Sequence, residues 1–197
     1  MPTELIRAYF LDKEELKKIQ MRIVLQAAPF IKRLKVSALI IVPNNLLIET
    51  SYLLEMLSVS KFCLYQNKRK TVLFLYHEDM LQQLLSEPER LEFLRRYGYG
   101  FLNKEKMLKR LAARMAQYYS GNDQFPHEIG IFLGYPQKDI EGFIANGGKN
   151  YLLSGYWKVY DNEEQTRALF EQYDRAREKA VYQLLCGIPL REIAAII

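Results

Sequence analysis

The residues with the clearest chemical potential lie between positions 125 and 160. This segment holds His127, which is one of only two histidines, followed directly by Glu128. It also holds six of the ten glycines and the only tryptophan, Trp157. An imidazole titrates near neutral pH and can carry a proton or bind a metal. His127 is therefore the candidate catalytic residue, with Glu128 beside it to orient the ring.

Metal binding is a second chemistry open to these residues. A zinc-protease helix needs a histidine four positions after His127, and Ile131 stands there, so that class is excluded. A mixed site built from His127, Glu128, His77 and a cysteine would suit Zn or Fe. No spacing demands such a site or specifies a cofactor, and a hydrogen-bonded core histidine is the alternative.

Two glycines in the same segment favour a close approach of the backbone. Gly130 and Gly134 are four residues apart and would share one face of a helix, where a ligand or another element can come near. Pro126 suits the first turn of that helix, whose free N–H groups would receive an anion. The alternative is tight packing, in which the glycines admit Tyr135 and Phe143.

Aromatic and basic residues alternate at the end of the segment. In a regular strand Tyr156 and Lys158 share one face, which would hold a flat or anionic ligand by stacking and charge. An edge strand with an inward Trp157 and a lysine reaching to solvent is the alternative. The candidate ligand-binding residues are therefore Gly130, Gly134, Tyr135, Tyr156, Trp157 and Lys158.

The elements that must position these residues alternate between helices and strands. Leu11–Ala28 has a helical apolar stripe, with Asp12 as its cap and Pro29 at its end. Val36–Val42 is a β-branched run that predicts a strand buried on both faces. Further helices are predicted over 45–57, 78–97, 103–119 and 161–185, and further strands over 59–66, 71–77 and 151–160.

These elements predict an α/β fold, with α+β as the alternative. Residues 1–197 would form a single domain, in which a small mixed sheet of about four strands is flanked by about six helices. Asn103 is the predicted cap of the helix over 103–119, and Asp161 that of the last long helix. The tail after Gly187 predicts a short helix that docks on the body.

Composition excludes several classes. With 49% hydrophobic residues the chain is not disordered, and its longest apolar run is too short to span a membrane. No secretory signal is visible and two cysteines make no disulfide framework, so we expect a cytoplasmic protein. The net charge is +5. Basic residues on the helix over 103–119 would suit phosphates, but nucleic acid is an unlikely partner because no recognition helix follows the turn in the tail.

The order of motifs in the segment resembles one known family. FPHEIGIFLGYP at 125–136 is followed by GFI, then NGGxN at 146–150 and WKVY at 157–160. This order is similar to that of the DUF3793 family, bacterial proteins of unknown function found chiefly in anaerobes, and the similarity extends over almost the whole chain. The resemblance implies no activity, cofactor or catalytic residue.

Two functions from different classes follow from these residues. The first is a small-ligand or cofactor-binding protein whose pocket is formed by 125–160, with an anionic small molecule as its ligand. The sequence does not decide whether such a protein is an enzyme, and it does not give the oligomeric state. The alternative is a binding or adaptor module that uses a basic helical surface to contact an acidic partner or nucleic acid.

Overall fold

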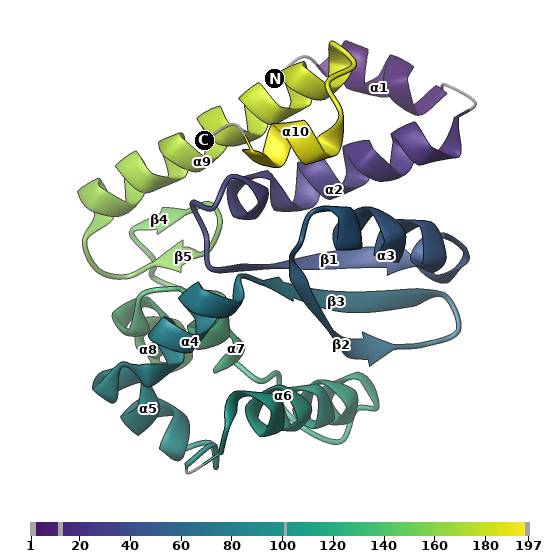
Figure 1. Ribbon diagram of the computed structural model, residues 1–197. Helices are drawn as coiled ribbons and strands as arrows, with labels where there is room; N and C mark the ends of the chain where they lie inside the picture. The colour runs from purple at the N-terminus through teal and green to yellow at the C-terminus, as the bar shows by residue number, and fades with distance from the viewer. Residues whose placement is uncertain (1–2, 12–13, 101, 196–197) are drawn as a thin grey trace.

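A three-stranded antiparallel sheet lies at the centre of the molecule, with helices on both of its faces (Figure 1). The computed structural model describes residues 3–11, 14–100 and 102–195. The strands are β1 (Ser37–Pro43), β2 (Ser60–Gln66) and β3 (Lys70–Tyr76), in the order β1-β3-β2. All pairings in this sheet are antiparallel, so the predicted mixed sheet is wrong in its strand direction.

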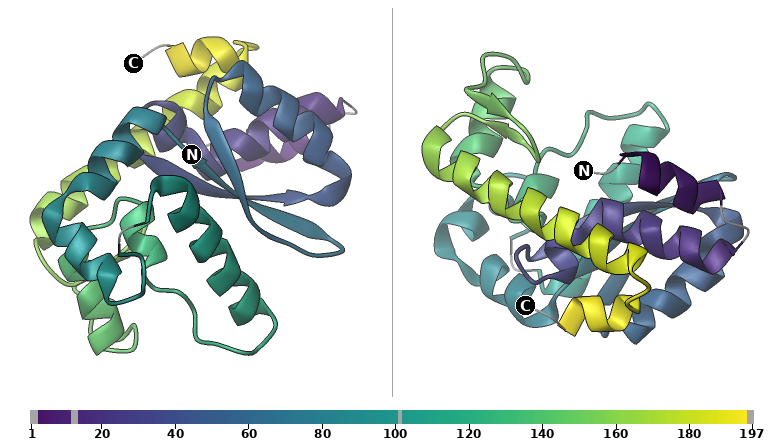
Figure 2. Two further views of the ribbon diagram at one scale, coloured as in Figure 1. Left: turned by 60° about the horizontal axis from the view of Figure 1, so that its bottom comes forward. Right: turned by 90° about the horizontal axis from the view of Figure 1, so that it is seen from above.

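Alternation along β3 divides the core into two layers. Leu73 and Leu75 belong to one buried cluster and Phe74 and Tyr76 to the other, because successive side chains point to opposite faces. The first layer contains α2 (Glu15–Ile31), α3 (Leu47–Met56), α9 (Glu163–Leu185) and α10 (Leu190–Ala195). The second contains α4 (Glu78–Ser86), α5 (Pro88–Arg95), α6 (Lys104–Tyr119) and α7 (Ile129–Phe132). Figure 2 shows α9 lying along α2 on the first side.

The strand β1 lies at an edge of the sheet, and the prediction that it is buried on both faces is wrong at Ile41. Ile41 is 50% exposed, whereas Ile40 and Val42 are buried. The side chain of Gln26 covers this edge, because its Oε1 accepts a hydrogen bond from the Ile41 backbone N–H at 2.8 Å. The amide of Gln26 thus blocks part of the free edge against another strand.

Several predicted elements are confirmed. The hairpin β2–β3 forms, and Asn103 caps α6 by accepting a bond from the Lys106 backbone N–H at 3.0 Å. The tail after Gly187 forms α10, whose Leu190 and Ile193 are buried. The fold class, helices and strands mixed in a single domain, is also confirmed. None of the described helices is long and apolar enough to cross a membrane.

Helix ends are where the predictions fail. The stretch predicted as one helix over 11–28 contains the end of α1 (Thr3–Leu11) and most of α2, while the predicted cap Asp12 lies outside the described residues. Pro29 lies inside the last turn of α2, which continues to Ile31. Asn162, with φ of 51°, is the residue before α9, and Asp161 does not cap it.

The predicted strand over 151–160 is a tight hairpin. Two short antiparallel strands, β4 (Leu153–Ser154) and β5 (Lys158–Val159), pair with Leu153 opposite Val159. The chain reverses at Gly155, where a Cβ atom would lie 2.4 Å from the ring of Phe170. Only glycine lets the turn approach α9 this closely. The hairpin forms a two-stranded sheet that is separate from the three-stranded sheet.

Candidate functional site

A cavity of about 350 Å³ lies within the segment that the sequence singled out. We refer to it as the pocket. Its walls come from the chain before and within α7, from α8 (Gln137–Ala145) and from the β4–β5 hairpin. Mostly apolar and aromatic residues line it, namely Phe125, His127, Ile129, Gly130, Tyr135, Asp139, Ile140, Phe143, Ser154, Gly155, Tyr156, Trp157 and Lys158.

The buried carboxylate of Asp139 holds the hairpin against α8. One oxygen accepts bonds from the backbone N–H groups of Tyr160 at 2.7 Å and Asp161 at 3.0 Å. The other accepts from Trp157 Nε1 at 2.7 Å. The indole also stacks on Tyr135, with ring centroids 4.8 Å apart. Asp139 is 2% exposed and its charge is balanced by three N–H donors, so it fixes the pocket wall.

Lys158 is the lysine that lines the pocket. Its Nζ donates to the Gly148 carbonyl at 2.6 Å and lies 4.9 Å from the ring centroid of Tyr151. No carboxylate of the described residues forms an ion pair with it. An ammonium group has three N–H donors, so Lys158 keeps donors and a positive charge for an anion.

His127 faces the pocket among aromatic rings. Its ring centroid lies 5.1 Å from that of Phe143 and 5.4 Å from that of Phe125. Burial lowers its pKa below the usual value, while the charge of Glu128 acts in the opposite direction. The ring is therefore neutral at pH 7, where it offers one donor and one acceptor to a ligand.

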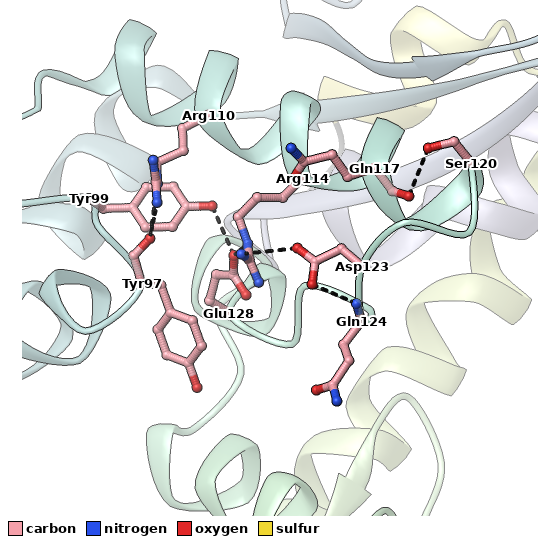
Figure 3. A network of polar contacts seen from close by, with 9 residues as sticks. All are labelled: Tyr97, Tyr99, Arg110, Arg114, Gln117, Ser120, Asp123, Gln124 and Glu128. Carbon is pink, nitrogen blue, oxygen red and sulfur yellow. Dashed lines mark hydrogen bonds and ion pairs between the residues drawn. The ribbon is translucent and has the colours of Figure 1, made fainter.

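Glu128 does not line the pocket and belongs to a network of polar contacts (Figure 3). It is 0% exposed, and its Oε1 accepts bonds from the Tyr99 hydroxyl at 3.1 Å and from Arg114 Nε. Arg114 also lies 3.5 Å from Asp123. The carboxylate thus contacts Tyr99 and Arg114 instead of His127, so the expected orienting pair is not formed. We call Tyr99, Arg114 and Glu128 the buried network.

The two candidate glycines serve packing. A Cβ atom at Gly130 would lie 2.8 Å from Ile140, and one at Gly134, where φ is 74°, would lie 2.7 Å from Val36. Gly130 lines the pocket and Gly134 does not. The N–H groups of 129–131 donate to the carbonyls of 126–128, so these three groups are not free to receive an anion.

His77 has a structural role outside the pocket. Its Nε2 lies 2.9 Å from the Phe30 carbonyl and its Nδ1 3.3 Å from Arg33 Nη1, so both ring nitrogens are engaged. The ring also stacks on Phe30. The structure therefore does not bring His77 to His127, and the described residues contain no group of three or more metal-ligating side chains.

Tyr156 and Tyr135 form one wall of the pocket and are joined to each other. The Tyr135 hydroxyl donates to the Tyr156 carbonyl at 3.3 Å, and the Tyr156 hydroxyl donates to Asp174 at 3.1 Å. Both residues are among the six candidate ligand-binding residues of the sequence analysis. The structure places them next to a third candidate, Trp157, in the lining of the pocket. With Gly130 and Lys158, five of the six candidate ligand-binding residues line the pocket.

Sequence reasoning missed several pocket residues, above all Asp139 and Phe143. Asp139 stands in the first turn of a helix, where an acidic residue is common for purely local reasons. Its role depends on the hairpin, which lies about twenty residues further along the chain. The repeated aromatic residues around Phe143 could have indicated that it lines the pocket. Aromatic residues are also common in hydrophobic cores, so this pattern did not distinguish the two positions.

The fold and the pocket define a single-domain protein of mixed helices and strands with one aromatic cavity built by a contiguous segment. A family model described as "Protein of unknown function (DUF3793)" matches residues 23–194. The chain belongs to this family. No curated protein and no solved structure shows significant similarity to it.

Proposed function

We propose that the pocket binds a small, flat and largely apolar molecule that carries one negative group. The observation that carries this proposal is the combination of a cavity of about 350 Å³ with aromatic walls and Lys158 at its lining. Pockets for small molecules have this size, and they combine apolar walls with a few polar groups. Stacking on Tyr135 and Trp157 would select a planar ligand.

The charge of the lining favours an anion over a cation. Asp139 is the acidic residue of the lining, and both of its oxygens already accept bonds from N–H groups. Lys158 keeps its charge without a carboxylate partner in the described part of the chain. A negative group near Lys158 gains a charge-assisted hydrogen bond, whereas a cation there would be repelled.

The proposal concerns binding and not catalysis. His127 has no carboxylate to orient it, because Glu128 bonds to Tyr99 and Arg114. A neutral imidazole in the pocket can still donate to or accept from a polar atom of the ligand. His127 is therefore assigned to ligand contact, together with Tyr135, Trp157 and Lys158.

The contacts of the basic residues give the adaptor hypothesis less support than the pocket gives to ligand binding. Of the basic residues on α6, Arg110 donates twice to the Tyr97 carbonyl, Arg114 belongs to the buried network, and Lys109 pairs with Glu105. Arg110 and Arg114 are thus held by groups of the protein itself, and Glu105 balances the charge of the exposed Lys109. The aromatic residues Tyr135, Phe143 and Trp157 are half-buried and line the pocket, so they do not form an open contact patch.

Fluorescence of the only tryptophan tests the proposal directly. Anilinonaphthalene sulfonate is a flat aromatic anion, and phenylnaphthylamine is its counterpart without the sulfonate. We expect both probes to quench Trp157 by energy transfer, with tighter saturable binding for the anion. A probe signal that does not quench Trp157, or tighter binding of the neutral probe, would contradict the proposal.

A further inference from the structure

The amine of Lys35 lies among three tyrosine rings beside the pocket. Lys35 belongs to the loop between α2 and β1, and its Nζ lies 5.3 Å from the ring centroid of Tyr135, 5.9 Å from that of Tyr156 and 5.8 Å from that of Tyr173. The three rings come from the chain after α7, from the hairpin and from α9. We call them the tyrosine cage. Tyr135 and Tyr156 also line the pocket.

The tyrosine cage presents ring faces to the amine and no oxygen acceptor. The three hydroxyl groups are used elsewhere, Tyr135 donating to Tyr156, Tyr156 to Asp174 and Tyr173 to Leu34. Asp174, which accepts the bond from Tyr156, is itself paired with Arg177 at 2.6 Å. Within the described ranges, Lys35 Nζ has neither a hydrogen bond nor an ion pair.

This environment destabilises the ammonium form of Lys35 relative to its neutral amine. Ring faces attract an ammonium group, but they do not replace the oxygen acceptors that water supplies to its three N–H groups. Burial accordingly lowers the pKa of Lys35 to about 8. About one tenth of the amine is then neutral at pH 7, against roughly one part in a few thousand for an exposed lysine.

We propose that Lys35 is a reactive amine that captures small aldehydes and ketones as imines. The nitrogen lone pair attacks the carbonyl carbon, and the π electrons of the C=O bond move to oxygen. A proton passes from nitrogen to that oxygen, which gives a carbinolamine. The hydroxyl group takes a proton from the solvent and leaves as water while the nitrogen lone pair forms the C=N bond. The iminium nitrogen then releases its remaining proton to the solvent, which gives the imine. A lysine desolvated by apolar neighbours is the kind of amine that performs this chemistry. The inference does not depend on the ligand proposed above.

Competition among the lysines of the folded wild-type chain tests this inference. Limiting formaldehyde forms imines, and cyanoborohydride then supplies the hydride that reduces each C=N bond to a stable amine, which peptide mass spectrometry locates. The exposed Lys68 and Lys149 are internal references. We expect Lys35 to react at least tenfold faster than either at pH 7, and its rate to reach half its maximum near pH 8.

Two outcomes would overturn the inference. One is a Lys35 rate equal to or below that of Lys68 and Lys149, and the other is a rate that still rises through pH 10, as for an ordinary lysine. Lys35→Arg is the matched variant, because it keeps a cation over the rings but forms no imine under these conditions. This variant must lose the fast reaction assigned to Lys35 and keep the slower reactions of Lys68 and Lys149. A fast reaction that persists in this variant would assign the reactivity to another amine.

Discussion

His127 and Glu128 are neighbours in the chain, but they belong to regions of opposite character. Glu128 lies in the buried network, where its Oε1 accepts bonds from Tyr99 and Arg114 while its Oε2 is buried without a hydrogen-bond partner. His127 lies in the pocket, where rings surround it and no described side chain bonds to it. The network contains an ion pair, whereas His127 in the pocket is surrounded by aromatic rings. Mutations in the two regions should therefore have different effects.

Removal of the carboxylate in the buried network should have the largest effect on stability. Glu128→Ala leaves Arg114 and Tyr99 without their shared acceptor in the interior. We expect the free energy of unfolding to fall by about 2 kcal/mol, since Tyr99 and Arg114 lose their acceptor while Arg114 keeps Asp123 at 3.5 Å. Urea unfolding measures this loss, and Glu92→Ala, in an exposed pair with Arg95, is the control with little effect. Equal stability of the two variants would refute the role assigned to the network.

Asp139 bonds both to the backbone of the hairpin and to Trp157 in the pocket wall. Its substitution should therefore change the stability of the protein and the environment of Trp157. In Asp139→Asn one oxygen becomes an amide donor that faces the Trp157 N–H, while the other oxygen still accepts the two backbone bonds. We expect a loss of about 1–2 kcal/mol and a red shift of the tryptophan emission. Asp161→Asn is the matched control, because its side chain pairs with the exposed Lys138. An unshifted emission maximum in Asp139→Asn would contradict this bond.

The neutral state of His127 predicts a pH dependence of stability. Burial lowers its folded pKa below 6.5, so the unfolded chain binds the proton more tightly. Stability is fully present above the unfolded pKa and is lost as the pH falls from there towards the folded pKa. His77, whose pKa is also lowered by burial, acts in the same direction. We expect urea midpoints to decrease between about pH 7.5 and 5.5, and less so in His127→Gln than in the wild type. An identical decrease in both proteins would contradict the buried position of His127.

The sequence predicted the location of the pocket but not the way in which it is built. The density of glycine and aromatic residues over 125–160 identified the right segment, and five of six candidate ligand contacts line the pocket. The direction of the Glu128 side chain was not predictable, because it depends on Arg114 and Tyr99, which approach only through the packing of α6.

The fold was predictable where local signals dominate. The β2–β3 hairpin and the Asn103 cap follow from a short polar turn and from one side chain. The hairpin at Gly155 and the exposed edge at Ile41 depend on distant partners, Phe170 and Gln26, and no local pattern reports these. The misassigned hairpin and sheet edge are thus places where the neighbours in space are far along the chain, whereas Pro29 and Asp161 were misassigned at helix ends.

The most direct test of the account is the effect of the Lys158 charge on binding. Lys158→Met keeps most of the side chain and removes its charge, and Lys149→Met does the same at an exposed position outside the pocket. Quenching of Trp157 gives the affinity of each variant for anilinonaphthalene sulfonate and for phenylnaphthylamine. We expect Lys158→Met to weaken binding of the anion by about tenfold, since a charge-assisted hydrogen bond is lost, and to leave binding of the neutral probe unchanged. Lys149→Met should change neither affinity. Equal losses for both probes, or an unchanged affinity for the anion, would contradict the pocket as an anion-binding site.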